Sequence, residues 1–196
     1  MEKTIMYIHG YLSSPKGSTA TKIKKTFGKR YNVVCPEVSA DPVKSLEIIN
    51  KAIKETKPMV IIGSSMGGLY ALASESGKTP LVLVNPLLKP VPVIKEHFLN
   101  KEFAYNSPRE DGAKTSTITE KELNEFASID VEALLEAKRG CVGAVVSLND
   151  ELLGTTALEA LEGKGAWITT GKDFGHRCSG SCFEKICGLV SSVEEI

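Results

Sequence analysis

The hydrophobic residues of this chain gather in six short apolar runs, which are separated by longer and more polar segments. The runs are rich in β-branched residues and nearly continuous rather than alternating, which is typical of strands in a parallel sheet covered on both faces. We therefore predict six parallel strands. Their expected ranges are Thr4–His9, Tyr31–Cys35, Met59–Gly63, Leu81–Asn85, Val142–Leu148 and Ala166–Thr170.

The segments between these runs have the spacing of helices. Asp41 and Pro42, for example, provide an N-cap followed by proline at the first helical position. The alternation of strand and helix predicts a three-layer α/β fold with right-handed crossovers, for which we expect the strand order 2-1-3-4-5-6. The expected helices are Lys16–Lys29, Pro42–Lys57, Met66–Glu75, Thr155–Glu162 and Ser181–Val193.

The spacer Pro86–Gly140 is about twice as long as the others. It contains a polar stretch, Ser107–Glu122, and two segments with helical spacing, Val93–Asn100 and Ile129–Lys138. A spacer of this length in a compact domain is usually functional, so we expect a short lid over a pocket. The alternative is a decorative insertion with a disordered tip. Because no repeat or linker divides the chain, we expect residues 1–196 to form one domain.

Composition narrows the classes of function. The chain has 24 basic and 24 acidic side chains, so its formal net charge of zero creates no long-range field for nucleic acid or an anionic membrane. Its first apolar run is too short and broken for a signal peptide or a transmembrane helix, and no other stretch approaches the ~20 consecutive apolar residues of a membrane span. We expect a cytoplasmic protein, without nucleic acid or stable membrane insertion, whose five cysteines stay reduced. The sequence leaves open whether the protein forms a homodimer.

A glycine-rich turn follows the third run. Gly63-Ser64-Ser65-Met66-Gly67 fits the pattern G-x-S-x-G, with Ser65 at its centre. When a strand turns directly into a helix, the central residue is strained and its side chain projects above the sheet. Gly63 and Gly67 are the small residues that let strand and helix approach closely. Ser65 is therefore the candidate nucleophile and Ser64 is off-centre. The alternative is a turn that only packs a helix against a strand.

A serine hydroxyl is a weak nucleophile and needs an adjacent base. The chain has three histidines. His9 precedes the serine, His97 lies in the expected lid, and His176 follows the last run. In α/β-hydrolases the residues follow the order serine, acid, histidine, and only His176 satisfies that order.

The acid that orients the histidine should follow the penultimate strand. Asp150 lies there, and Glu151 is the fallback. Asp173 is closer to His176 in sequence but shares its short loop. We expect Asp173 to be a solvated acid, because the orienting group normally comes from the end of a different strand.

The tetrahedral intermediate of acyl transfer also needs two N–H donors. We expect one from the backbone of Met66, which follows the candidate nucleophile. The other should come from Tyr11, because Gly10 lets the chain turn after the first strand. His9 is expected to brace that loop through a side-chain hydrogen bond rather than to react.

With these residues placed, the chain resembles the YqiA/YcfP-like family of small bacterial α/β-hydrolase esterases. The matching pieces span almost the whole chain, and HG-x-x-SSP together with GSSMGG and NP is much more specific than G-x-S-x-G alone. The pieces are YIHGYLSSP (Tyr7–Pro15), IIGSSMGG (Ile61–Gly68), VNPLLKP (Val84–Pro90), NDELL (Asn149–Leu153) and GHR (Gly175–Arg177).

The resemblance implies an α/β-hydrolase fold, esterase or thioesterase activity on acyl substrates, and no metal or organic cofactor. It carries the roles of nucleophile, acid and base over to Ser65, Asp150 and His176. At two places the chain departs from the family. Asn149 stands where glycine more usually precedes the acid, and Arg177-Cys178 follows the histidine where a small and an aromatic residue are expected.

We therefore predict a serine hydrolase that cleaves esters or thioesters of small to medium acyl groups through an acyl-enzyme. Val93, Phe98 and Phe103 of the insertion are expected to line or cover its acyl pocket. One alternative is an acyltransferase on the same triad. The other is a binding module with the hydrolase fold and a vestigial site.

The cysteines suggest a metal or redox site as a further alternative. Cys178, Cys182 and Cys187 form one C-x₃-C and one C-x₄-C spacing without a second pair, which is not typical of zinc sites. We expect no metal and buried reduced thiols, with Cys178 the one that an adjacent arginine could make oxidisable. Cys35 and Cys141 are expected in the core, on strands.

Overall fold

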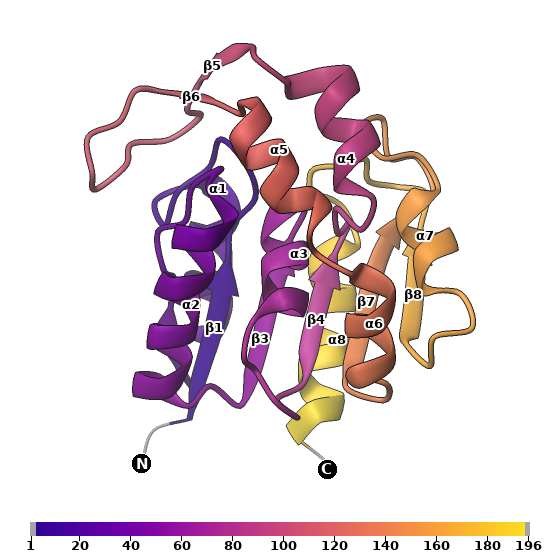
Figure 1. Cartoon of the computed structure of the whole chain (residues 1–196). Helices are drawn as coiled ribbons and strands as arrows, with labels where there is room; N and C mark the ends of the chain where they lie inside the picture. The colour runs from indigo at the N-terminus through magenta and orange to yellow at the C-terminus, as the bar shows by residue number, and fades with distance from the viewer. Residues whose placement is uncertain (1–2, 195–196) are drawn as a thin grey trace.

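The computed structural model describes residues 3–194 of the chain. Its centre is a six-stranded sheet in which every pair of neighbouring strands is parallel (Figure 1). The strand order β2-β1-β3-β4-β7-β8 confirms the expected order, because β5 (Glu102–Ala104) and β6 (Thr115–Thr117) form a separate pair outside this sheet. The strands of the main sheet are β1 (Thr4–Ile8), β2 (Asn32–Val34), β3 (Val60–Ser64), β4 (Leu81–Val84), β7 (Val142–Ser147) and β8 (Trp167–Gly171).

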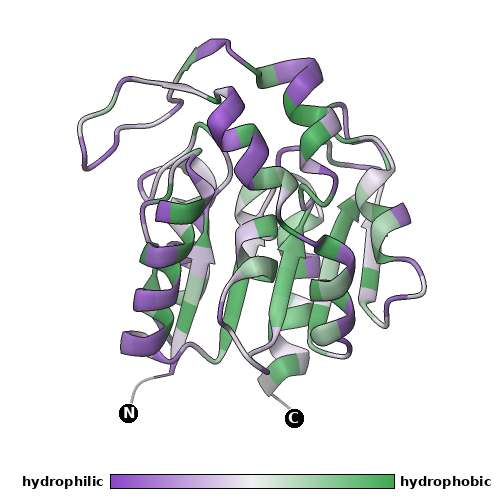
Figure 2. Ribbon diagram, in the orientation of Figure 1, coloured by the Kyte–Doolittle hydropathy of each residue, from purple (hydrophilic) through white to green (hydrophobic). Residues whose placement is uncertain are grey.

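Alternate residues of the strands pack on opposite faces of the sheet. In β1, Ile5 and Tyr7 belong to one buried cluster, and Met6 and Ile8 belong to the other. The strands are accordingly the most hydrophobic part of the molecule, and polar residues gather on the outer helices and the insertion (Figure 2). Helices α1 (Ser18–Phe27) and α8 (Cys182–Glu194) cover the first face, and α2 (Pro42–Thr56), α3 (Met66–Ala73), α6 (Val131–Ala137) and α7 (Thr156–Leu161) cover the second.

The expected start of α2 is confirmed. Its N-cap is Asp41, whose carboxylate accepts a hydrogen bond of 3.0 Å from the backbone N–H of Lys44, and Pro42 follows at the first helical position. This satisfies one of the N–H groups that have no partner inside the first turn of a helix.

The insertion lies over the carboxyl ends of the strands (Figure 1), except for α6 at its end, which packs on the second face of the sheet. The two expected helical segments are present, the first as a short α-helix followed by a π-helix. The stretch Ser107–Glu122, which we expected only to be polar, contains strand β6 (Thr115–Thr117) and the start of helix α5 (Glu120–Ala127), which begins with a capping box of Thr119 and Glu122. Strand β6 pairs antiparallel with β5 (Glu102–Ala104). The additional elements are α4 (Pro90–Val93), η1 (Ile94–Phe98), β5 (Glu102–Ala104), β6 (Thr115–Thr117) and α5 (Glu120–Ala127).

One buried arginine attaches the polar tip of the insertion to the body. The guanidinium of Arg109 donates a hydrogen bond of 2.8 Å to the carbonyl oxygen of Val38 and bonds to the carboxylate of Asp111. The backbone N–H groups of Glu110 and Asp111 donate in turn to the carboxylate of Glu37. These contacts join residues that are far apart in sequence, so an order that local composition did not indicate is imposed by tertiary contacts.

Within residues 3–194 there is no helix with the length and apolar character needed to cross a membrane.

The prediction that Cys35 and Cys141 lie on core strands was wrong. Cys35 directly follows β2, Cys141 directly precedes β7, and both are only partly buried, because the strands are shorter than the apolar runs.

Candidate active site

Ser65 occupies the sharp turn between β3 and α3. Its backbone has φ 54° and ψ −121°, a strained conformation for a residue with a side chain. A Cβ on Gly63 would lie 2.3 Å from the carbonyl oxygen of Gly67, and one on Gly67 would lie 2.2 Å from that of Ile8. Glycine is therefore required at both positions for β1, β3 and α3 to approach one another. The N–H of Ser65 donates a hydrogen bond of 2.9 Å to the carbonyl oxygen of Val84.

Three side chains from distant loops meet beside this turn. Nε2 of His176 lies 2.9 Å from Oγ of Ser65, and Nδ1 of His176 lies 2.9 Å from Oδ2 of Asp150. The Asp150 side chain is 3% exposed and that of His176 is 15% exposed. The imidazole thus links a buried carboxylate to a serine hydroxyl, an arrangement that can take the proton of the hydroxyl as the oxygen attacks a carbonyl carbon.

Backbone groups hold the Asp150 carboxylate in place. Its Oδ1 accepts hydrogen bonds of 2.9 Å and 2.8 Å from the N–H groups of Leu152 and Leu153. Burial alone would raise the pKa of Asp150, but the hydrogen bond and charge of His176, together with these N–H groups, bring the pKa below its ordinary value. The carboxylate is therefore ionised near neutral pH and can stabilise a charged imidazole.

The other two acids considered from the sequence have different partners. Glu151 accepts a hydrogen bond of 2.7 Å from the backbone N–H of His176, so it contacts the loop and not the ring. Asp173 accepts from both the backbone N–H and the hydroxyl of Ser181, just before α8. Of the three acids, Asp150 is the one whose carboxylate contacts the imidazole.

The loop after β1 passes directly beside Ser65. A Cβ on Gly10 would lie 3.1 Å from the Cβ of Ser65, so a larger residue would crowd the hydroxyl. Tyr11 follows Gly10 and lines the cavity described below. Met66 is the first residue of α3, where a backbone N–H has no partner within the helix. The two N–H groups proposed from the sequence thus belong to the segments that flank Ser65.

His9 supports this loop from the protein interior. Its Nδ1 lies 2.9 Å from the carbonyl oxygen of Gly10, and its Nε2 accepts a hydrogen bond of 3.2 Å from the N–H of Val38. Burial lowers the pKa of His9 to about 4, which keeps the ring neutral. A neutral ring with the proton on Nδ1 satisfies both bonds.

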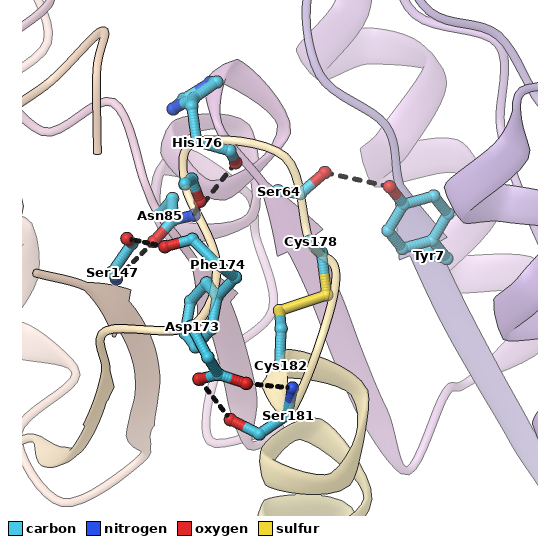
Figure 3. The surroundings of a disulfide bond; sticks show 11 residues. Tyr7, Ser64, Asn85, Ser147, Asp173, Phe174, His176, Cys178, Ser181 and Cys182 are labelled. Carbon is cyan, nitrogen blue, oxygen red and sulfur yellow. Dashed lines mark hydrogen bonds between the residues drawn. A yellow bond between two sulfur atoms is a disulfide. The ribbon is translucent and has the colours of Figure 1, made fainter. Parts of the chain in front are cut away.

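Ser64 faces away from the imidazole. Its hydroxyl lies 2.8 Å from the hydroxyl of Tyr7 (Figure 3). Burial raises the pKa of Tyr7 above its ordinary range, so this pair stays neutral. Ser64 therefore lacks the adjacent base that Ser65 has.

A cavity of about 940 Å³ opens above Ser65 and His176. Val93 and Phe98 of the insertion line it, as expected from the sequence. Phe103 was expected there too, but it packs behind the wall, with its ring centroid 5.6 Å from that of Phe98. Other residues of the wall are the largely apolar Tyr11, Leu12, Leu87, Leu152 and Leu153, and the polar Ser13, Thr19, Asn106, Arg177 and Ser179.

The expectation that all five cysteines are reduced was wrong for one pair. Cys178 and Cys182 form a disulfide between the His176 loop and the start of α8 (Figure 3). The three-residue spacing, bent by the turn before the helix, brings the two sulfur atoms together. Cys187 is free, as are Cys35 and Cys141. Among the residues that the structure describes, no group of three or more His, Cys, Asp or Glu side chains could hold a metal ion.

Sequence reasoning overlooked Asn85 and Ser147, two buried polar residues at the ends of β4 and β7. Both contact the loop that carries His176. A signal was present in the sequence, because a polar residue directly after or within a continuous apolar strand is costly to bury without a hydrogen-bond partner.

The six-stranded parallel sheet and the helices on its two faces form an α/β-hydrolase fold. Several solved structures share the fold. Est1E from Butyrivibrio proteoclasticus has a TM-score of 0.73 at 15% identity, over 98% of this chain and 87% of its own. A monoacylglycerol lipase from Paleococcus ferrophilus has a TM-score of 0.69 at 13% identity, over 98% and 95%. Mouse alpha/beta hydrolase domain-containing protein 10 has a TM-score of 0.65 at 14% identity, over 100% and 90%.

Within this class the sequence identifies the family. Residues 4–170 match the uncharacterised protein family UPF0227, and the chain belongs to that family. This confirms the YqiA/YcfP-like resemblance that the serine turn, the HG loop and the NP segment indicated.

Proposed function

We propose that this protein is a serine hydrolase that cleaves carboxylic esters or thioesters of small to medium acyl groups. The observation that carries the proposal is the continuous hydrogen-bonded chain from the buried Asp150 carboxylate through His176 to the Ser65 hydroxyl. The strained backbone of Ser65 and the cavity beside it add support, because they present the hydroxyl to a bound molecule. The α/β-hydrolase fold is shared with proteins named as an esterase domain and a lipase, which makes acyl chemistry the first choice.

In the proposed reaction, Oγ of Ser65 attacks the acyl carbonyl carbon and Nε2 of His176 takes the hydroxyl proton. Asp150 holds the ring and stabilises its positive charge. The backbone N–H groups of Met66 and Tyr11 donate to the negatively charged oxygen of the tetrahedral intermediate, each contributing about 10²–10³ in rate. His176 then protonates the leaving alcohol or thiol, and the acyl group stays on Ser65.

A water molecule completes the cycle. His176 takes a proton from the water as it attacks the acyl-enzyme, and returns the proton to Oγ of Ser65 as the carboxylic acid leaves. The cavity walls from the insertion, including Val93 and Phe98, would surround the acyl chain. Because the insertion is short, we assign small to medium acyl groups rather than a bulk lipid surface.

The test is intact mass after incubation with a fluorophosphonate, using wild type, Ser65→Ala and Ser64→Ala. We expect one adduct on wild type and on Ser64→Ala, and none on Ser65→Ala. The Ser64 variant is the matched control, because its hydroxyl is adjacent in sequence but contacts Tyr7 instead of the imidazole. Absence of an adduct on folded wild type would contradict the proposal and favour a binding module with the hydrolase fold.

Hydrolysis and acyl transfer are separated by the products. The protein should be incubated with the esters or thioesters that it turns over and with competing alcohols and amines, and the products should be identified by mass. Free acid as the main product supports hydrolysis. Transfer to the added acceptor at comparable rates would instead identify an acyltransferase on the same three residues.

A further inference from the structure

Asn85 uses every polar group of its side chain to bind the surroundings of His176. It follows β4, has φ 41°, and is 1% exposed. Its Nδ2 donates hydrogen bonds of 3.0 Å and 2.9 Å to the carbonyl oxygens of Gly175 and His176. Its Oδ1 accepts one of 2.7 Å from the N–H of Ser147, in the neighbouring strand (Figure 3).

These bonds belong to a short buried row. The hydroxyl of Ser147 donates to the carbonyl oxygen of Phe174, so three successive carbonyls of the loop, those of residues 174 to 176, are bound from the sheet (Figure 3). The hydroxyl of Ser147 also accepts from the N–H of Asn149, which directly precedes Asp150. The loop has no helix or strand of its own here, so these side chains supply the bonds that regular structure would supply elsewhere.

The same strand end also holds the candidate nucleophile. The carbonyl oxygen of Val84 accepts from the N–H of Ser65, and the next residue, Asn85, binds the carbonyl of His176. The backbones of Ser65 and His176 are thus hydrogen-bonded to two consecutive residues, Val84 and Asn85. Because only a few covalent bonds separate these two anchoring groups, they fix the distance between Oγ of Ser65 and Nε2 of His176, although Ser65 and His176 are far apart in sequence.

We infer that Asn85 is a positioning residue, which fixes the backbone of His176 relative to Ser65 so that the imidazole reaches the hydroxyl. This inference rests on the proposed function. Positioning His176 in this way requires two N–H donors and one acceptor on a short side chain at a positive φ, a combination that asparagine supplies. A carboxylate of the same shape would retain the bond to Ser147 but face two carbonyl oxygens without a proton to donate.

The experiment compares wild type with Asn85→Asp and Asn85→Gly, and measures the rate of fluorophosphonate labelling, kcat and KM for a p-nitrophenyl ester, and the melting temperature. Asn85→Gly tolerates the positive φ, so it replaces Asn85→Asp if the latter does not fold. Asn32→Asp is the matched control. Its amide also donates a side-chain hydrogen bond, to the hydroxyl of Thr4, but it is exposed on β2 and does not contact the His176 loop.

We expect Asn85→Asp to lower kcat and the labelling rate by about 10²-fold near neutral pH while KM changes less than about threefold, because loss of reacting geometry affects the transition state more than ground-state binding. The deficit relative to wild type should shrink as the pH is lowered, since a protonated carboxyl regains one donor. Asn32→Asp should stay within about twofold of wild type.

Each result decides between the two proposals. A folded Asn85 variant that is labelled at the wild-type rate overturns the positioning role and leaves the proposed function intact. Equal loss in kcat and 1/KM, with no change of the deficit with pH, also overturns it and indicates a general structural role. If wild type itself is neither labelled nor active, the proposed function fails, and the positioning role with it.

Discussion

The carboxyl edge of the sheet and the insertion Pro86–Gly140 meet at the cavity, but they are held in place differently. At the sheet edge, Ser65, Asn85 and Asp150 each lie within a few residues of a strand end and are fixed by short, largely buried hydrogen bonds. The insertion reaches the cavity through apolar side chains such as Phe98, which contacts other aromatic rings. Its polar tip is attached to the body mainly through Arg109 and its neighbours.

This difference separates two tasks. Hydrogen bonds to backbone groups fix atoms to within tenths of an ångström, which proton transfer and attack on a carbonyl require. Apolar contacts are less directional, so a wall built from them can change shape without disturbing the reacting groups. We therefore expect changes at the sheet edge to alter the rate of reaction, and changes in the insertion to alter which acyl groups are accepted.

The largest expected effect is at the sheet edge. Asp150→Asn should lower kcat by about 10³–10⁴-fold, because an amide cannot stabilise the charged imidazole and favours the wrong tautomer. The matched control is Asp173→Asn, on the same loop as His176 but bound to Ser181. Steady-state kinetics on the best p-nitrophenyl ester provides the measurement. A variant at Asp150 with near wild-type kcat would contradict the assignment of the acid.

A smaller and selective effect is expected in the insertion. Phe98→Ala removes a ring from the cavity wall, so kcat/KM for medium-chain esters should fall about tenfold, while that for the acetate ester should change little. Phe103→Ala is the control, because this ring contacts Phe98 but does not line the cavity. The measurement is kcat/KM over a series of acyl chain lengths. An equal loss for all chain lengths would argue against the division of tasks.

The buried His9 makes the sheet edge sensitive to acid. Its pKa in the fold is about 4, below its ordinary value of 6.5, so the unfolded chain binds the proton more readily than the folded one. The stability that comes from the neutral ring is complete above about pH 6.5 and is lost as the pH falls toward about 4, by on the order of 3 kcal/mol. Urea unfolding across this range should show the loss.

In His9→Gln that part of the pH dependence should be absent. His97→Gln, in the insertion, is the matched control, since this histidine lies in the cavity wall and is about one-third exposed. If the His9 variant kept the same loss of stability between pH 6.5 and 4, the acid sensitivity would have to come from other groups.

The smallest effect is expected at the disulfide. Although Cys178 is only two residues after His176, the backbone carbonyls of Gly175 and His176 are bound by Asn85, so reduction should change kcat by less than about twofold. The melting temperature should fall by a few degrees, because the crosslink closes only a short loop. Thiol titration of the unfolded protein checks the pairing. Three of the five cysteines should react before reduction and all five after it.

Much of this protein is determined by local patterns in the sequence. The six parallel strands and their order followed from apolar runs and their connections, since a strand buried on both faces must be apolar throughout. The turn around Ser65 was recognisable because glycine is needed wherever backbones come this close. Chain order then singled out His176, and the position of Asp150 after the penultimate strand singled out that acid. In the structure His176 lies within hydrogen-bond distance of Ser65, and Asp150 lies within hydrogen-bond distance of His176.

Contacts between distant residues decided the rest. The ribbon β5–β6 and its tip are too polar to form a core, and they depend on Arg109 reaching Val38 in a segment far away along the chain. The disulfide depends on how the chain turns into α8, which spacing does not reveal. Asn85 is the clearest case. Its amide acquires a role only when β4, β7 and the His176 loop come together, because hydrogen bonds of buried polar groups are satisfied in space and leave no periodic trace in the sequence.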